Sequence, residues 1–418
     1  MKIEKLGSFL TEIVAPMFPG STVEKSNFVP QNRTTETVVY DHAPTRLRVR
    51  QNSIATEFFA LVRVQSWDNA EKHLVRKLLA VFDQTKSTAP TFLNQLEDFV
   101  VRRAIAQTVG VDKQAETLEA ILETLAAWAS QTYEGERVSA GILIAATPAS
   151  TGTAKFSLLE LMKEDFGKVL SDGVDSWWRV DEASLVLGFD TVDSSKANVS
   201  ERGCFPLRYL PLASRTSGKE VGVALNRNGE ILMFAQGELK FAKRRGKWLH
   251  FTHEPVITSM SWGGASALDV REAIYESCLD ASIARSGGCI GIIRKQLLSS
   301  FVTKCPVSND DVLDRAAKLK PLTAAQLICG KAFQSIPRLV RKELLGLDGA
   351  VVLRWDGVVV AAGAILELHD VKRGNQGGRS AAAKALSRFG MGIKISEDGM
   401  ISGYKLETGE GKPAFEVG

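Results

Sequence analysis

The chain has few of the residues that build covalent or metal-held frameworks. Its 418 residues include only five cysteines and five histidines. The cysteines form no Cys-x-x-Cys pair and are odd in number, which fits a reducing compartment and argues against a disulfide scaffold. Only His250 and His253 lie close together, and no cysteine or acid stands beside them at ligand spacing, so we expect no zinc site.

Long apolar runs are also missing. No uncharged stretch reaches the roughly eighteen residues that a membrane-spanning helix needs. Residues 1–6 alternate charged and apolar side chains, unlike the continuous apolar segment of a signal peptide. The sequence contains no internal repeat and no low-complexity tract. We therefore expect a cytoplasmic protein without a membrane partner.

Charge of one sign does not dominate either. The formal net charge is +4, which is mild for this length and does not require nucleic acid. The densest basic run, residues 243–248, lies between two strand-like segments. That position favours a solvated hairpin loop over a phosphate-binding patch. Nucleic acid is therefore not expected as a partner, and this loop keeps it only as a minor alternative.

The length and apolar content indicate more than one domain. Hydrophobic residues make up 44% of the chain, and single hydrophobic cores stop growing near 250–300 residues. Local patterns predict an α/β and α+β multidomain protein. Its expected parts are an N-terminal α/β domain (1–135), a sheet-rich α+β middle domain (136–262) and a C-terminal α/β domain (263–418).

In the last of these parts, an Asp-Gly pair separates two β-branched runs. The runs are residues 350–355 and 358–366, with Asp356-Gly357 between them. This pattern predicts a hairpin, and a type I′ turn would require positive φ at both central residues. The first strand directly follows Asp348-Gly349, so a carboxylate stands at its start.

About thirty residues later a glycine pair precedes a helical pattern. Gly377-Gly378 is followed by apolar residues at helical spacing, and we expect Ser380 to cap the helix and Gly390 to end it. The unpaired N–H groups at the start of a helix attract anions. This segment therefore predicts a phosphate site.

A second acidic pair, Glu397-Asp398, follows a strand predicted at 391–395. Strand ends are where α/β folds usually place their chemistry. Each motif alone has a simpler explanation, since Asp-Gly-Ala is commonly a turn, Arg379 a solvated cation, and an acidic pair before glycine a hairpin turn. Their order and spacing favour a shared nucleotide pocket.

At these residues the sequence resembles the diadenylate cyclase domain family, which condenses two ATP molecules into cyclic di-AMP across a face-to-face dimer. The likeness covers residues 265–418. It includes a helix at 268–283, a glycine-rich strand at 287–293, and the Ile-Ser-Glu-Asp-Gly segment at 395–399. The resemblance implies a diadenylate-cyclase-like α/β domain with a mixed central sheet flanked by helices, and a homo-oligomer.

The resemblance also implies roles for particular residues. Asp348 matches the carboxylate that binds metal and activates the 3′-hydroxyl. The family's Gly-Thr-Arg-His-Arg motif is depleted, because residues 377–381 read Gly-Gly-Arg-Ser-Ala and only Arg379 remains. The candidate nucleotide-binding residues are Asp348, Gly349, Ala350, Gly377, Gly378, Arg379, Ser380 and Glu397. Asp348 is the candidate catalytic residue, and Asp348 and Glu397 the candidate metal ligands, only if the protein is an enzyme.

Three hypotheses follow from this depletion. One preorganised donor is worth about 10²–10³ in rate, so the loss of a hydroxyl, an imidazole and a guanidinium disfavours catalysis more than binding. The first hypothesis is a catalytically degenerate sensor of a nucleotide such as ATP or of a cyclic dinucleotide. The resemblance links such relatives to prokaryotic antiviral defence, with a protein effector as a further partner. The alternative is an active cyclase that makes cyclic di-AMP or a related product with Mg²⁺ or Mn²⁺, and the third is a vestigial pocket. No cofactor is expected for the sensor.

Overall fold

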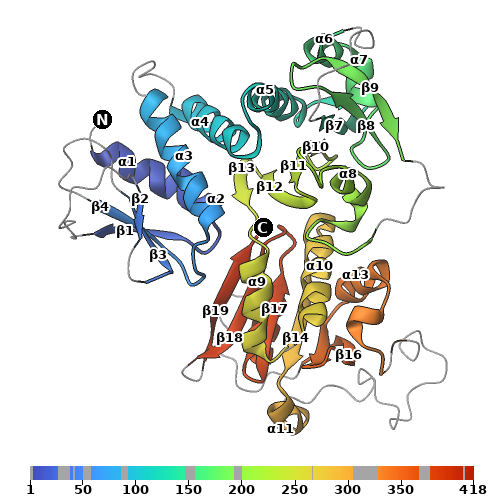
Figure 1. Ribbon diagram of the computed structural model, residues 1–418. Coiled ribbons are helices and arrows are strands. Elements are labelled where there is room, and N and C mark those ends of the chain that lie inside the picture. The colour runs from blue at the N-terminus through green and yellow to red at the C-terminus, as the bar shows by residue number, and fades with distance from the viewer. Residues whose placement is uncertain are drawn as a thin grey trace. The chain divides into compact units, whose positions relative to one another are not determined.

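The computed structural model describes most of the chain, and contacts between residues divide it into two compact units (Figure 1). The described residues are 3–26, 38–40, 43–49, 58–85, 93–145, 156–192, 200–265, 267–304, 328, 330–366, 377–407 and 410–418. The first unit holds residues 1–199 and 208–251, and the second holds residues 200–207 and 252–418.

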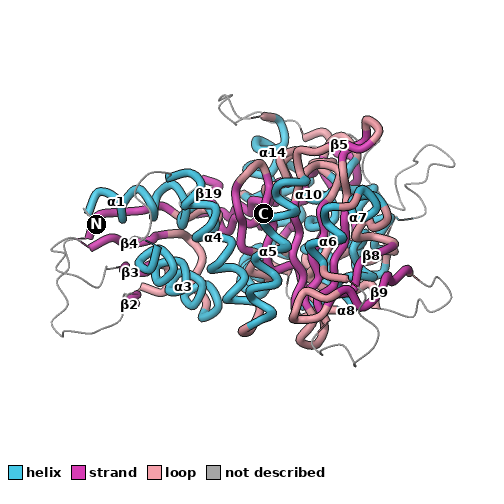
Figure 2. The backbone as a smooth tube through the Cα atoms, turned by 90° about the horizontal axis from the view of Figure 1, so that it is seen from above, coloured by secondary structure: helices cyan, strands magenta, loops and turns pink. Residues whose placement is uncertain are grey.

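The first unit opens with a small antiparallel sheet and several helices. The sheet has the order β1-β4-β3-β2, and Figure 2 shows helices α3 and α4 side by side. The elements are α1 (Ile3–Phe9), a π-helical turn (Leu10–Val14), α2 (Ala15–Met17), β1 (Thr22–Ser26), β2 (Val38–Tyr40), β3 (Arg46–Val49), β4 (Phe58–Val62), α3 (Asn69–Thr85), α4 (Leu93–Val109), α5 (Lys113–Trp128), β5 (Thr132–Tyr133) and β6 (Glu136–Arg137).

A seven-stranded sheet forms the rest of this unit, in the order β13-β12-β11-β10-β7-β8-β9. Neighbouring strands are antiparallel except for β7 and β8, which are parallel. The strands are β7 (Ala140–Ile144), β8 (Ser176–Val180), β9 (Val186–Thr191), β10 (Val221–Leu225), β11 (Ile231–Ala235), β12 (Glu238–Arg244) and β13 (Lys247–His250). The helices are α6 (Leu158–Lys163), α7 (Asp165–Val169), a 3₁₀ turn (Leu207–Tyr209) and α8 (Leu210–Arg215).

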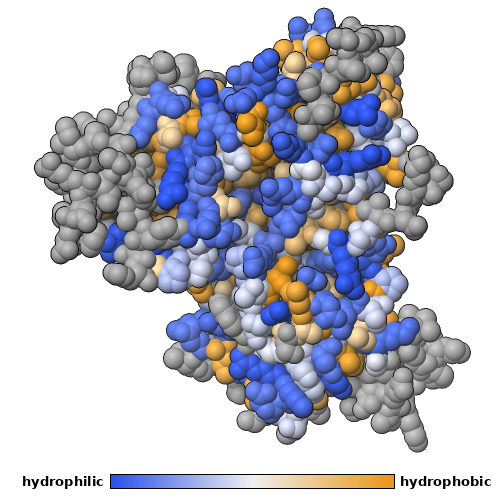
Figure 3. Space-filling model, viewed as in Figure 1, coloured by the Kyte–Doolittle hydropathy of each residue, from blue (hydrophilic) through white to orange (hydrophobic). Residues whose placement is uncertain are grey.

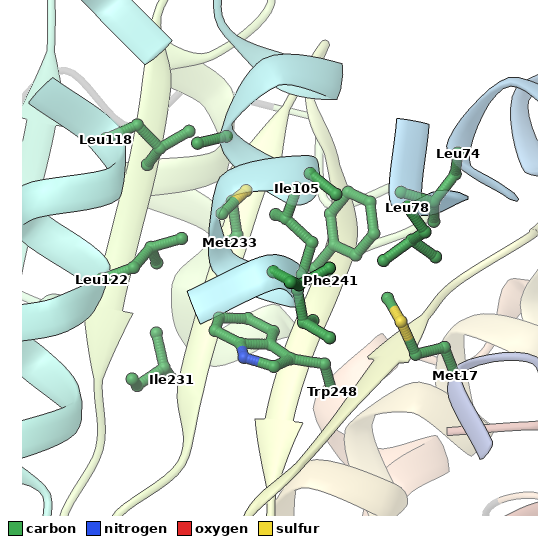
Figure 4. Packing of buried hydrophobic residues seen from close by; sticks show 14 of the residues in the cluster. Met17, Leu74, Leu78, Ile105, Leu118, Leu122, Ile231, Met233, Phe241 and Trp248 are labelled. Atoms are coloured by element: carbon green, nitrogen blue, oxygen red, sulfur yellow. The ribbon is translucent and has the colours of Figure 1, made fainter. Parts of the chain in front are cut away.

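One hydrophobic cluster runs through this unit from Leu6 to Trp248. Leu118 and Leu122 of α5 pack with Ile231 and Met233 of β11, as Figure 4 shows. The apolar stripe of α5 is therefore a packing face. Because this cluster takes residues from both sides of the boundary expected at residue 135, the division of the chain into three domains stays a prediction.

The basic run at 243–248 forms a hairpin, as expected, but it is not a solvated loop. Only Arg245 and Gly246 make the turn, both at positive φ. Arg244 is buried and its Nε donates to Glu230 at 2.9 Å, and Lys243 pairs with Asp98 at 2.9 Å. The run of basic residues led us to expect exposed side chains. Arg244 and Lys243 are instead paired with Glu230 and Asp98, which are distant in sequence and could not be recognised as partners from the local pattern.

The second unit is built on a six-stranded mixed sheet in the order β16-β15-β14-β17-β18-β19. Strands β14 and β15 are parallel and the other neighbours are antiparallel. The strands are β14 (Gly288–Ile293), β15 (Ala350–Arg354), β16 (Val359–Ala364), β17 (Gly390–Ile395), β18 (Ile401–Glu407) and β19 (Glu410–Val417). The helices are α9 (Glu254–Ser259), a 3₁₀ turn (Met260–Gly263), α10 (Leu268–Ala284), a 3₁₀ turn (Lys295–Leu297), α11 (Leu298–Lys304), a 3₁₀ turn (Phe333–Ser335), α13 (Arg338–Gly346) and α14 (Gly378–Ser387).

Two glycines allow α14 to approach the sheet closely. A Cβ at Gly392 of β17 would lie 1.8 Å from the carbonyl oxygen of Ala383, and one at Gly291 of β14 would lie 2.7 Å from Leu386 Cδ2. These distances are far below van der Waals contact, so side chains at these positions would push the helix away. The paired glycines therefore let α14 lie close against β14 and β17.

A buried ionic network holds residues 200–207 to the second unit. Arg338 of α13 is 1% exposed, donates to both carboxylate oxygens of Asp280 on α10, and also donates to backbone carbonyls of Glu201 and Phe205. Asp280 in turn accepts from the Leu207 N–H at 2.6 Å. Burial raises the pKa of Asp280 while the Arg338 charge opposes that rise. No sequence pattern indicated this network.

Two details of the predicted secondary structure need correction. The β15–β16 hairpin exists, but only Gly357 in its turn has positive φ, so the loop of Trp355, Asp356 and Gly357 is a three-residue turn rather than type I′. In α14, the N-cap is Gly377, without a side-chain hydrogen bond, and Ser380 lies one turn inside. Gly390 is the first residue of β17 and not the residue that ends the helix.

No helix in the described ranges is both long and apolar enough to cross a lipid bilayer. On the face drawn in Figure 3, polar and apolar side chains are interspersed.

Candidate functional site

Sheet register brings the predicted site segments to one end of the second unit's sheet. Ile290 pairs with Val351 in the parallel neighbour, and Gly288 pairs with Ile395 in the antiparallel one. Continuing these registers outward puts Gly287 between the segment that holds Asp348 and the turn that holds Glu397. The site therefore lies at the amino ends of β14 and β15 and at the carboxyl end of β17. Glu397 follows the end of β17 and Asp348 precedes the start of β15, as the sequence pattern predicted.

Asp348 is exposed at the start of β15 in a backbone conformation that depends on glycine. Gly349 has φ of +101°, and a Cβ there would lie 2.5 Å from the carbonyl carbon of Gly363 on β16. Its N–H donates to Asp348 Oδ1 at 3.1 Å. Ala350, the next residue, is buried as the first residue of the strand. The Asp-Gly-Ala triplet thus presents one exposed carboxylate on a constrained turn.

Arg379, on the first turn of α14, forms an ion pair with Glu397. Its Nη1 lies 2.9 Å from Glu397 Oε1, and the two side chains are 37% and 76% exposed. The guanidinium also lies against Gly287, where a Cβ would come within 2.5 Å of Nη1. The Glu397 carbonyl accepts from Arg285 Nη1 at 3.3 Å. Among the described contacts Asp348 makes no bond to this pair, so the structure joins two of the three predicted charged residues.

The amino end of α14 supplies backbone donors next to Arg379. The N–H groups of Ser380 and Ala381 already bond the Gly377 carbonyl, at 2.9 and 3.3 Å. Gly378 and Arg379 are the first two helical residues, and their N–H groups have no partner within a helix. Gly377 and Gly378 are exposed, and a Cβ at either would meet nothing within 4 Å. These glycines leave open space, and Ser380 is buried.

Glu397 occupies a tight turn between β17 and β18. The Gly399 N–H bonds the Ser396 carbonyl at 2.9 Å, and Gly399 has φ of +90°. The acidic pair is therefore both a hairpin turn and part of the candidate site. Cys289, the strand residue that feels the Arg379 charge, is buried, and burial raises its pKa to about 12.

Chemically, the arrangement suits an anion more than a metal ion. The described residues contain no group of three or more histidine, cysteine, aspartate or glutamate side chains arranged to hold a metal. Asp348 and Glu397 remain the only predicted metal ligands, and Glu397 is bonded to Arg379 instead. A guanidinium beside free helix N–H groups is a recurrent phosphate-binding arrangement.

Comparison with known proteins yields little. No protein-family model matches the chain, and no curated protein matches it. Among solved structures, a crystal structure of a double mutant of DacA from Staphylococcus aureus, a diadenylate cyclase, matches with 19% identity and a TM-score of 0.22. The match covers 35% of this chain and 86% of that one. It is a weak likeness of fold.

Sequence reasoning did not identify Arg285 and Gly287 as site residues. Gly287 has φ of +67° and lies under the Arg379 guanidinium, and Arg285 at the end of α10 has φ of +58°. A glycine pair before a strand, at 287–288, was the available signal. It indicated a tight entry to β14, but only the fold shows that α14 meets it.

Proposed function

We propose that the chain binds the phosphate groups of a nucleotide or cyclic dinucleotide at the amino end of α14 and acts as a sensor of that ligand. The observation that carries this proposal is the position of Arg379, whose side chain lies beside unpaired helix N–H groups and pairs with an exposed carboxylate, Glu397. An exposed ion pair of this kind is worth about 0–1 kcal/mol. A phosphate can therefore replace Glu397 as the partner of Arg379 at little cost.

The sensor function follows from what the site lacks. Phosphoryl transfer relies on metal ions and on several cations that hold the transferring group. After Arg379 the helix continues with Ser380, Ala381 and Ala382, of which none is charged, and the nearby Arg285 donates to the Glu397 carbonyl. Binding needs fewer donors than catalysis, so ligand recognition survives the depletion better than turnover. We propose that occupancy is relayed to a protein effector by a shift between conformations.

Several parts of this proposal rest on the resemblance described above rather than on the site. They are assignment of a diadenylate-cyclase-like domain to residues 263–418, assembly into a homo-oligomer, a cytoplasmic location, and a role in prokaryotic antiviral defence. Size-exclusion chromatography with light scattering tests the oligomer. Limited proteolysis at the boundaries near residues 135 and 262 tests the three-domain division.

Calorimetric titration of the full chain with cyclic di-AMP, cyclic di-GMP and ATP tests the sensor. We expect one of these ligands to bind, and Arg379→Ala to weaken its binding by about tenfold or more, because a charge-assisted hydrogen bond contributes about 1.5–3 kcal/mol. Arg388→Ala is the matched control, since Arg388 is exposed at the other end of the same helix. Equal affinity of all three proteins would contradict the proposal.

A second function, cyclic dinucleotide synthesis, is favoured by one observation: the Asp348 carboxylate is exposed on an intact, constrained Asp-Gly-Ala turn. Incubation with ATP and GTP in the presence of Mn²⁺ or Mg²⁺, followed by mass spectrometry, decides between the two functions. A cyclic dinucleotide product that disappears in Asp348→Asn would establish the enzyme.

A further inference from the structure

The first unit contains a cavity of about 290 Å³ that is remote in sequence from the site above. It is lined by Ser139, Asp172, Arg208, Tyr209, Asn226 and Arg227. Two guanidinium groups and one carboxylate face the same space, so positive charge is in excess. Arg208 and Arg227 are exposed, whereas Tyr209 and Asn226 are buried. The cations therefore stand at the mouth and the uncharged polar groups at the floor.

Packing fixes the floor of this cavity. Asn226 Oδ1 accepts from the N–H groups of Asn228 and Glu230, and Asn226 Nδ2 donates to Glu230 Oε2 at 2.8 Å. Glu230 is in turn bonded to the buried Arg244. Tyr209 packs on Phe234 with ring centroids 5.5 Å apart. The polar floor is thus held in place whether or not a ligand is bound.

A close approach of two backbones places Asp172 at the cavity wall. Gly173 has φ of +73°, and a Cβ there would lie 2.7 Å from the Cβ of Ala224 on β10. A Cβ at Gly141 of β7 would lie 2.4 Å from the Cα of Gly173. Asp172 Oδ1 accepts from the N–H groups of residues 174, 175 and 176. The loop lies flat on the sheet because both glycines lack side chains.

Three polar groups in the cavity have no partner among the described residues. They are the Arg208 guanidinium, the Ser139 hydroxyl and the second carboxylate oxygen, Oδ2, of Asp172. Arg227 has one long contact, 3.4 Å to Glu136, with both side chains mostly exposed. Polar groups that line one cavity and are not engaged by the protein are available to a ligand.

The geometry points to a binding site for a small phosphate monoester of sugar size. Arg208 and Arg227 would bind the phosphate, because guanidinium groups recognise it with paired hydrogen bonds. Asp172 Oδ2 and Ser139 would bind hydroxyl groups of the sugar. The volume lies just below the 300–1,000 Å³ range of drug-sized pockets, which excludes a dinucleotide. Tyr209 adds no negative charge to repel the ligand, because a phenol is neutral at pH 7 and burial raises its pKa further, to about 12.

Titration calorimetry of the full-length Arg379→Ala variant tests this site, because that background removes the phosphate site proposed at α14. The probes are ribose 5-phosphate, ribose and inorganic phosphate. We expect ribose 5-phosphate to bind more tightly than inorganic phosphate, and ribose not to bind. Adding Arg208→Gln should weaken binding by about tenfold to a hundredfold, the loss expected for one charge-assisted contact.

Arg215→Gln is the matched control, because Arg215 is an exposed arginine on α8 that does not line the cavity. Arg227→Gln serves as the second test variant, and thermal melts establish that each variant is folded. Dissociation constants weaker than about 10 mM for both phosphates would overturn the proposal. Equal binding by the Arg208→Gln and Arg215→Gln proteins would overturn it as well. Either failure leaves the α14 site untouched, since that site is absent from every protein in this experiment.

Discussion

Glu397→Gln distinguishes the two functions proposed for the α14 site, because they predict opposite changes in nucleotide affinity. For a sensor, Glu397 competes with the ligand phosphate for Arg379, so removing its charge favours binding. For a metal-dependent enzyme, Glu397 is a ligand of the cation that neutralises the phosphates, so removing its charge weakens binding. The substitution keeps the size of the side chain and leaves the backbone of the 396–400 turn unchanged.

The magnitude follows from the exposure of the pair. Arg379 and Glu397 are 37% and 76% exposed, and such pairs contribute about 0–1 kcal/mol. Since 1.4 kcal/mol corresponds to a factor of ten, releasing Arg379 should tighten nucleotide binding by up to about fivefold. The gain should shrink as salt is added, because exposed charges are screened over about 10 Å at 0.1 M ionic strength.

The assay is titration calorimetry with the tightest-binding nucleotide, with and without Mg²⁺, at two salt concentrations. Glu407→Gln is the control, since it makes the same change of charge at an exposed position on β18. A Glu397→Gln protein that binds more weakly than both the wild type and this control would refute the competition argument. Weaker binding only in the presence of Mg²⁺ would favour the enzyme.

Three further predictions test the fold. Arg338→Met should destabilise the second unit by about 3–5 kcal/mol, because it leaves Asp280 buried without its cation; chemical denaturation measures this, and a change below 1 kcal/mol would show that the network is not structural. Gly392→Ala should lower the melting temperature, because the added Cβ would overlap the Ala383 carbonyl oxygen and overpacking costs about 1–3 kcal/mol; an unchanged melting temperature would mean that α14 shifts freely. Burial raises the pKa of Tyr209 to about 12, so the stability that the neutral phenol contributes is fully present below pH 10 and is lost as pH rises towards 12. Absorbance at 295 nm should therefore show Tyr209→Phe and wild type titrating alike up to about pH 11, and a difference near pH 10 would contradict the burial argument.

Local patterns in the sequence predicted several helices and strands of the second unit. The hairpin of β15 and β16 and the helix after Gly377-Gly378 follow from periodicity and from glycine turns, which act over a few neighbouring residues. The helix α10 was expected from the family resemblance instead. The same patterns marked Asp348, Arg379 and Glu397 as candidates. The turn type at Asp356 and the cap of α14 were not predicted correctly, because several backbone conformations satisfy the same local residues.

The tertiary structure determines the interaction partners of the charged residues. Arg379 reaches Glu397 and Gly287 because glycines at 291 and 392 let α14 lie against the sheet in one position. From the sequence, Arg244 was expected in a solvated loop. In the structure it is buried and pairs with Glu230. Arg338 and Asp280 are 58 residues apart in sequence, and no periodic pattern links them. Periodicity reports which face of an element is buried, whereas the partner of a buried charge depends on which distant element packs there.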